Sequence, residues 1–416
     1  MGHGPDKVAI AEAKGLRHVS GDASAQGGAM PAWMMFLLAT ASGLAAANVY
    51  YSQPLVGPIS ETLHIPASRA GFVVTMTQIG YGIGLIFLVP LADLLENRRL
   101  VVAVLALGAT ALLAAGLATT PAMFLSAALV IGIGSVAVQM LVLYGAHLAD
   151  DSNRGRVVGN ITGGLMLGIM LARPVASGIA ALSSWRAVFV VAAVLIALLA
   201  AALWRILPQR MPSVRLGYGK LLTSLVGLAR GEPELQRRTI YQAFLFAAFS
   251  LFWTTVPLVL ATEFRLSQAG IALFALSGAA GAVAAPIAGR MSDHGYGAPA
   301  TLIAMLLAAG AFLITHIGGL GSGLALACLV IAAIALDFGV QTSGVIGQRT
   351  ILTLRPEARS RLNGLFIASF FVAGAAGSAL GGWAYAYGGW PLASWIGFAL
   401  PVAALICFST EKNRED

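Results

Sequence analysis

Residues 100–149 read LVVAVLALGATALLAAGLATTPAMFLSAALVIGIGSVAVQMLVLYGAHLA, and this stretch decides the fold. Its 50 residues include no Asp, Glu, Lys or Arg. A helix needs about 20 residues to cross the hydrocarbon core of a bilayer, so the stretch is long enough for two crossings. Thr119-Thr120-Pro121 supplies a turn between them. The sequence therefore predicts two membrane-spanning helices joined by a short loop.

Similar uncharged stretches fill most of the 416-residue chain, in which only 10% of the residues are charged. A soluble domain usually carries about 25% charged residues, so a soluble fold is excluded. The stretches do not alternate in polarity as the strands of a membrane β-barrel do, which excludes a barrel. We expect twelve transmembrane helices, at residues 32–53, 70–91, 100–118, 122–146, 157–182, 187–206, 239–261, 269–289, 299–317, 322–346, 362–386 and 391–409.

The Lys and Arg residues are distributed unevenly among the loops between these helices. The two tails and every second loop hold 21 of the 25 basic residues. Loops rich in Lys and Arg stay in the cytoplasm, so we expect both termini to be cytoplasmic in a multi-pass protein of the bacterial inner membrane. The net charge of +8 is then a sign of membrane topology, and we expect no nucleic-acid partner.

The chain also reads as two similar halves. Asp93 and Asp293 follow the second and eighth expected helices, and Val138-Gln139 matches Val340-Gln341 in the fourth and tenth. The matches keep their order along both halves, as an internal duplication requires. The predicted fold is an all-α membrane protein with twelve transmembrane helices in two pseudo-symmetric six-helix bundles. The expected units are a disordered cytoplasmic tail (1–31), an N-terminal six-helix bundle (32–206), a cytoplasmic linker (207–238), a C-terminal six-helix bundle (239–409) and a cytoplasmic tail (410–416).

The loop after the second expected helix resembles a family signature. Residues 89–99, through Asp93, Arg98 and Arg99, resemble the Gly-x-x-x-Asp-(Arg/Lys)-x-Gly-(Arg/Lys)-(Arg/Lys) motif of the major facilitator superfamily, although both of its glycines are replaced. The second copy, Gly289–Gly295, keeps Asp293. The resemblance implies the major facilitator fold and a secondary transporter. It also implies that Asp93, with Arg98 and Arg99, forms a latch for the outward-open state.

More specific strings resemble bacterial drug or sugar efflux proton antiporters. The fifth helix resembles the antiporter signature Gly-x-x-x-Gly-Pro-x-x-Gly-Gly only in part, because Arg173 stands where that signature has Pro. The resemblance implies an exporter and names no substrate. The strings that carry it are Asn48–Pro54, Leu171–Arg173, Leu336–Gln341 and Arg355–Asn363.

Two charged residues, Asp337 and Arg173, lie deep inside expected helices. An isolated charge near the bilayer midplane costs about 3 kcal/mol, so each needs a partner, a proton or water. We predict that Asp337 loads and releases a proton as its cavity faces each side in turn. Arg173 would serve as its counter-charge or as a contact for substrate. The alternatives are a structural carboxylate, and an Arg173 that holds backbone carbonyls near Pro174.

Other polar residues form two predicted sites. Asp93, Arg98, Arg99 and Asp293 lie at the cytoplasmic edge and are candidates for a gate, with a plain topology anchor as the alternative. Amides and aromatic rings within the helices suit a small amphipathic or polar solute, although each alone can also serve to join helices. The expected substrate-binding residues are Asn48, Tyr51, Gln53, Gln78, Tyr81, Gln139, Gln242, Trp253 and Gln341.

These observations predict a proton-coupled exporter that works by alternating access. The sequence has no Walker loop and no Cys/His cluster, so we expect no ATP-driven step, metal or cofactor. The expected partners are a small-molecule substrate, protons and the lipid bilayer, and we expect a monomer. The alternatives are uptake by proton symport or facilitated diffusion, and an enzyme that acts on lipid. Such an enzyme would need a convergent nucleophile, base or metal set, which the sequence lacks.

Overall fold

A computed structural model describes residues 31–150, 153–211 and 217–412 of the chain. Within these ranges the structure is helical, without strands. The expected tails fall mostly outside, at residues 1–30 and 413–416. The first half contains α2 (Ala32–Ala47), α3 (Val56–Thr62), α4 (Phe72–Phe87), α5 (Asn97–Gly116), α6 (Pro121–Ser135), α7 (Ala137–Leu148), α8 (Arg154–Leu182) and α9 (Trp185–Ile206).

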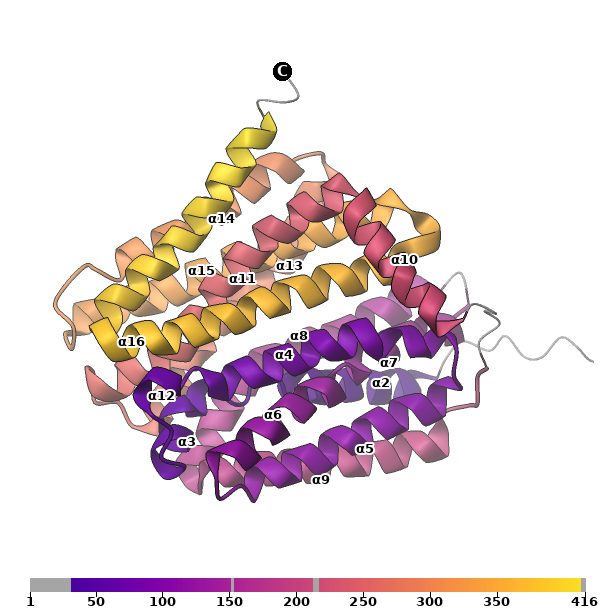
Figure 1. The fold of residues 1–416 in the computed structure, drawn as a ribbon, viewed down its shortest axis with the longest axis horizontal. Helices are drawn as coiled ribbons and strands as arrows, with labels where there is room; N and C mark the ends of the chain where they lie inside the picture. Colours follow the sequence, from indigo (N-terminus) through magenta and orange to yellow (C-terminus); the bar gives the residue numbers. More distant parts are fainter. Residues whose placement is uncertain (1–30, 151–152, 212–216, 413–416) are drawn as a thin grey trace, which may run out of the picture.

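The second half follows the linker helix α10 (Tyr218–Gly231), and in Figure 1 most of it lies above the helices of the first half. Short 3-10 turns, η1 (Gln53–Leu55), η2 (Ala67–Arg69), η3 (Val89–Asp93), η4 (Leu276–Ala279) and η5 (Pro356–Ala358), separate several helices. The second half contains α11 (Pro233–Thr262), α12 (Gln268–Ala275), α13 (Ala280–Asp293), α14 (Gly297–Ile314), α15 (Gly323–Leu354) and α16 (Arg359–Lys412).

Ten helical segments in the described ranges are long and apolar enough to cross a membrane. The last segment contains two expected helices, because the chain bends at Gly389 (φ 60°, ψ −158°) and the two arms of α16 diverge in Figure 1. A left-handed φ of this kind is one that glycine adopts without strain. Helix α2 has 16 residues and is too short to be among the ten. The expected number of twelve is reached when α16 is divided and α2 is joined to η1 and α3.

Three of the expected helices are broken. The continuous helix expected over 32–53 is wrong, since α2 ends at Ala47 and the chain passes through turns into η1. Pro54 lies inside η1, where it has no backbone donor for an α-helical bond to the Tyr50 carbonyl. The helix expected over 122–146 is divided at Val136, which follows the glycine-rich C-terminal end of α6. The helix expected over 269–289 is interrupted by η4. Broken helices bring non-helical backbone into the middle of the protein, where it can form a site.

Glycines let the helices within each half approach closely. Gly168 of α8 lies against the backbone of Gly43 in α2, and Gly377 of α16 lies against that of Ala247 in α11. Helices α2 and α8 correspond to the first and fifth expected helices of the first half. Helix α11 and the first part of α16 correspond to the first and fifth expected helices of the second half. Small residues at such crossings allow backbone contact in a bilayer, where apolar burial gives no drive for association. The same contact in both halves agrees with the predicted duplication.

The halves meet through backbone contacts at glycines, through side chains and through the linker. Gly71, just before α4, lies against Ser378 and Gly382 of α16. Thr75 of α4 donates to the carbonyl of Ala375 in α16 (3.0 Å), and Gln268 of α12 donates to that of Pro54 (3.1 Å). The linker, expected over 207–238, contains α10, and α11 already begins at Pro233. Helix α10 contacts both halves, because Tyr218 Oη donates to the Phe87 carbonyl (2.9 Å) and Ser224 Oγ accepts from Arg361 Nη1 (2.8 Å).

The glycine contact predicts a difference between two alanine substitutions in the same helix. A Cβ at Gly168 would overlap the Gly43 backbone, whereas a Cβ at Gly163 would meet nothing within 4 Å. Overpacking costs about 1–3 kcal/mol, and alanine is about 1 kcal/mol better than glycine inside a helix. We expect Gly168→Ala to lower the thermal unfolding midpoint in detergent by several degrees, and Gly163→Ala to leave it unchanged or raise it. Equal midpoints would contradict the close α2–α8 contact.

Candidate functional site

The structure brings together the two charges that the sequence analysis placed inside helices. Arg173 lies on α8 of the first half and Asp337 on α15 of the second, with Nη1 and Oδ2 3.9 Å apart. Their side chains are only 2% and 4% exposed. A buried charge needs an opposite charge beside it, and each residue provides this for the other. The pair therefore connects the two halves in the interior of the protein.

Arg173 has several further partners. Its Nε donates to Gln53 Oε1 (2.6 Å), which η1 holds beside it. Its guanidinium carbon lies 4.1 Å from the ring centroid of Trp253, 5.0 Å from that of Phe249 and 5.3 Å from that of Tyr50. Aromatic faces attract a guanidinium by about 0.5–2 kcal/mol each. Arg173 is thus held by an amide and three rings as well as by the carboxylate.

Asp337 has fewer partners than Arg173. Its Oδ1 accepts a hydrogen bond from Trp253 Nε1 (2.7 Å), and its Oδ2 faces Arg173. Gly278 of η4 lies against this group, because a Cβ there would be 3.0 Å from Asp337 Oδ2 and 3.0 Å from the Trp253 ring. The break in the eighth expected helix therefore leaves room for the carboxylate. Asp337 depends more on the ion pair than Arg173 does.

A small cavity lies beside the ion pair. Arg173, Asp337 and Gln341 contribute its polar lining, and Phe249 contributes an aromatic wall. Met166, Ile169 and Met170 of α8 contribute apolar lining. The described residues contain no group of three or more His, Cys, Asp or Glu that could hold a metal ion. The groups that the site presents are an ion pair, amides and aromatic rings.

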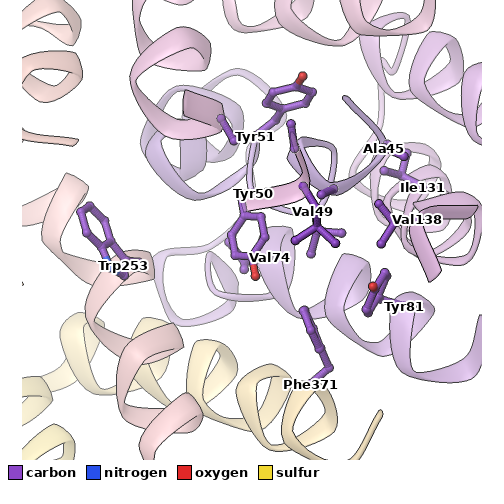
Figure 2. Packing of buried hydrophobic residues seen from close by; sticks show 14 of the residues in the cluster. Ala45, Val49, Tyr50, Tyr51, Val74, Tyr81, Ile131, Val138, Trp253 and Phe371 are labelled. Carbon is purple, nitrogen blue, oxygen red and sulfur yellow. The ribbon is translucent and has the colours of Figure 1, made fainter. Parts of the chain in front are cut away.

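Three of the nine expected substrate-binding residues lie at this site, namely Gln53, Trp253 and Gln341. Tyr51, also expected there, points away from Tyr50 and Trp253 in Figure 2. The sequence analysis missed Tyr50 and Phe249. The signal for Tyr50 was its place beside Tyr51, but helical spacing cannot tell which ring faces inward once α2 has ended at Ala47.

Most of the other expected residues join helices to one another. Gln78 donates to Ser250 Oγ (2.9 Å) and accepts from Ser378 Oγ (3.3 Å), which connects the first half to the second. Gln139 donates to Tyr81 Oη (3.3 Å), and Gln242 donates to the carbonyl of Val340 (3.3 Å). The Tyr81 ring packs against Phe371 of α16 at a centroid distance of 4.5 Å (Figure 2). Asn48 is buried, and its Oδ1 has no hydrogen-bond partner.

The expected gate residues separate into different contacts. Arg98 donates to the carbonyl of Leu207 (3.2 Å) and lies over the ring of Trp204, and Arg99 pairs with Glu96 (3.7 Å). None of these contacts is with Asp93. The two arginines follow Glu96, which caps the N-terminus of α5, so they belong to that helix and its neighbours.

Asp93 lies instead in a second small cavity. Its lining includes Arg361 of the second half and Leu225 of α10. Arg361 and Arg210 act on the Asp93 carboxyl electrostatically, as does His147 at the end of α7. Asp93 is therefore positioned to connect the two halves near η3.

Asp293 has the equivalent position in the second half, and it pairs with Arg349 of α15. Arg349 also donates to the carbonyl of Gly289 (2.9 Å). The sequence analysis missed this arginine, although an offset of 202 residues relates it to His147, as it relates Gln341 to Gln139. His147 of α7 and Arg349 of α15 thus have equivalent positions with respect to Asp93 and Asp293.

Known proteins resemble this chain along nearly its whole length. The family model of the Major Facilitator Superfamily matches residues 36–351 and 239–416. A protein of Escherichia coli O157:H7, named "Uncharacterized transporter YgaY", is 38% identical over 384 residues, which are 92% of this chain and 96% of that protein. A protein of Streptomyces coelicolor, named "Probable transporter SCO4007", is 33% identical over 361 residues, 85% of this chain and 82% of that protein.

Solved structures with little sequence identity share the fold. A single-residue mutant of the nucleoside transporter NupG has a TM-score of 0.73 at 16% identity, over 91% of this chain and 99% of its own. A bacterial homologue of the human lysosomal transporter Spinster, in an inward-facing and occupied conformation, has a TM-score of 0.71 at 16% identity. The match covers 92% of this chain and 96% of that chain. The chain belongs to the Major Facilitator Superfamily, and it is a multi-pass membrane transporter of small molecules rather than an enzyme.

Proposed function

We propose that this transporter exports a small amphipathic or polar solute from the bacterial cytoplasm in exchange for protons, by alternating access. In this proposal it works as a monomer in the inner membrane, with both termini in the cytoplasm. The observation that carries the proposal is the buried Arg173–Asp337 ion pair, because its two members belong to different halves. A proton that binds Asp337 acts directly on a contact between the parts that must move.

The coupling step follows from the unequal surroundings of the two charges. With Asp337 ionised, the pair is neutral overall and holds the halves together. When Asp337 is protonated, the charge–charge attraction between Asp337 and Arg173 is lost. The Arg173 guanidinium still contacts Gln53 and the three aromatic rings. Breaking a buried ion pair by removing one charge costs about 3–5 kcal/mol, and the remaining partners of Arg173 offset part of that cost. Each proton that enters down 100 mV supplies about 2.3 kcal/mol.

A second set of contacts that supports alternating access involves Asp93 and Asp293, away from the Arg173–Asp337 pair. Asp93 lies beside Arg361 of the other half, and Asp293 pairs with Arg349 inside its own half. An acidic group at such a junction can hold one state and release in another. In this proposal Asp93 tightens and loosens the junction between the halves, and Asp293 fixes the geometry of its own half.

The transport test uses purified protein in proteoliposomes, with a panel of metabolites and drugs and an imposed pH gradient. Export in exchange for protons predicts accumulation of a solute inside vesicles that are acidic inside, driven by the outward proton gradient. Accumulation in vesicles with the opposite gradient indicates proton symport. Equilibration without dependence on the gradient indicates facilitated diffusion, and either result contradicts the proposal.

Asp337→Asn tests the coupling residue. Asparagine keeps the size and the acceptor for Trp253 but cannot exchange a proton. We expect gradient-driven accumulation to fall at least ten-fold and its dependence on pH to disappear, whereas exchange of substrate for substrate persists. Asp150→Asn, an exposed carboxyl at the end of α7, is the matched control and should behave like the wild type. Retained uphill transport by Asp337→Asn would contradict the proposed role.

The Asp293–Arg349 pair allows a charge-swap test. We expect Asp293→Arg and Arg349→Asp to lower the transport rate several-fold each, since each places like charges side by side, and the double variant to recover most of it. Arg290→Asp, a reversal of charge on the same helix end, serves as the control. A double variant that is no better than the single ones would show that the pairing itself is unimportant.

The orientation can be tested with single cysteines after the two free cysteines, Cys328 and Cys407, are replaced by alanine. Gly319 lies in the exposed loop between α14 and α15, and His294 lies between α13 and α14. A membrane-impermeant maleimide should label Gly319→Cys in intact cells and His294→Cys only after lysis. The reverse pattern would place the termini outside the cytoplasm.

A further inference from the structure

Gln268 connects the two halves at the end of the protein that lies away from the linker. Helix α11 begins beside α10 and ends at Thr262, so the residues that follow it lie at the opposite end (Figure 1). Gln268 is the first residue of α12, and its Nε2 donates to the Pro54 carbonyl (3.1 Å) and to Ser177 Oγ (3.2 Å). Pro54 belongs to η1 and Ser177 to α8. One side chain of the second half thus joins two elements of the first.

The sequence explains why the Pro54 carbonyl takes its donor from the other half. An α-helical bond to this carbonyl would come from the backbone N–H four residues later, but residue 58 is also proline and has no N–H. Pro54 is buried, and a buried carbonyl without a donor is costly. In the second half, Pro257 is followed four residues later by Ala261, which has an N–H. The need for an outside donor therefore arises at η1 and not at the corresponding place in α11.

The two elements that Gln268 contacts also position Arg173. From η1, Gln53 accepts a hydrogen bond from Arg173 Nε (2.6 Å). Ser177 lies four residues after Arg173 on α8, so the two side chains are on one face of that helix. The Gln268 contact and the Arg173–Asp337 pair therefore join α8 to the second half at positions about one helical turn apart.

We infer that Gln268 is a gating residue that holds closed the end of the transporter away from the linker. This inference rests on the proposed function, in which that end faces the outside of the cell. Opening the end requires α12 to separate from α8 and η1, and both hydrogen bonds of Gln268 break in that step. Water can replace them once the end is open, so the net cost of release is modest and the step is reversible.

The corresponding crossing between the halves is built differently. There Gly71, just before α4, lies against the backbone of Ser378 and Gly382 in α16. The start of the second expected helix thus meets the eleventh, as the start of the eighth meets the fifth. Backbone contact at a glycine depends on shape, whereas the bonds of Gln268 depend on one side chain. A substitution at Gln268 therefore tests closure without changing a backbone contact.

The position of Gln268 also relates the gate to the proton site. The titratable groups that act on Asp337 are Arg173 of α8 and Tyr50 of the turn after α2. Protonation of Asp337 removes the charge pair and leaves the bonds of Gln268 to hold α8 against α12. If Gln268 is removed as well, less acid is needed to open the end. The pH at which the end opens should then be higher in the variant than in the wild type.

The test measures distances between the halves with spin labels, in purified full-length protein in detergent. The labels are attached to cysteines at Leu182, exposed at the end of α8, and at Gly319, exposed between α14 and α15. The free cysteines, Cys328 and Cys407, are first replaced by alanine. Opening of this end lengthens the distance between the labels. We expect Gln268→Leu, which keeps the size and removes both bonds, to raise the ratio of long to short distances about ten-fold at neutral pH.

Two further variants control this measurement. Gln236→Leu is the matched control, because the Gln236 amide also donates to backbone carbonyls, at the end of α10. This control should keep the wild-type ratio. Ser177→Ala removes one of the two acceptors and should raise the ratio by a smaller factor. If Gln268→Leu lowers the thermal unfolding midpoint but keeps the wild-type distances, its role is structural only and the gating assignment is overturned.

The same ratio, measured as the pH is lowered, separates this inference from the proposed function. A ratio that rises with acid, and does so at a higher pH in Gln268→Leu, supports both. If Gln268→Leu opens the end but acid changes neither protein, the gating assignment stands and the proposed proton coupling fails. If acid opens the wild type and Gln268→Leu opens no more readily, the coupling stands and the gating assignment is wrong. Should Gln268→Leu fail to fold, Ser177→Ala decides in the same way.

Discussion

The structure depends on the need to compensate two full charges in an interior whose other buried polar side chains, among the described residues, are uncharged. Arg173 and Asp337 belong to different halves, and both side chains are almost fully buried. Each is stable only where the other is present. The two halves must therefore meet at this level, and the backbone around the pair must bring the remaining partners. Much of what is irregular in the fold can be traced to that requirement.

The irregular backbone lies where the partners are needed. The break after α2 places Tyr50 and Gln53 beside the guanidinium, and η4 places Gly278 against the carboxylate. A continuous helix in either position would hide its backbone groups and give fewer choices of side-chain direction. In a membrane protein, non-helical backbone is tolerated only where it is surrounded by protein or lines a cavity. The breaks in the helices thus supply the partners of the ion pair, and the surrounding protein allows these breaks in the interior.

The sequence was sufficient for the parts of this arrangement that follow from composition and spacing. Apolar length located the membrane helices, and the scarcity of charge singled out Arg173 and Asp337. It could not show that Tyr50 rather than Tyr51 faces the pair, because that depends on the turn after Ala47. It could have indicated Arg349, since the offset that relates the two glutamines also relates this arginine to His147. The amides Gln78, Gln139 and Gln242 look alike in sequence, and only tertiary packing shows that they join helices.

Close glycine contacts occur within each half and also between the halves, where Gly71 lies against the backbone of Ser378 and Gly382. Within a half, glycines such as Gly168 and Gly377 bring helix backbones into direct contact, and any sliding would cost many atomic contacts at once. Between the halves, the ion pair and the hydrogen bonds of Gln78 and Gln268 are made by single side chains. Such bonds can exchange one partner for another at little net cost, because each replaces one polar contact with a second. Among these single-side-chain contacts between the halves, the Arg173–Asp337 pair is the one that carries full charges.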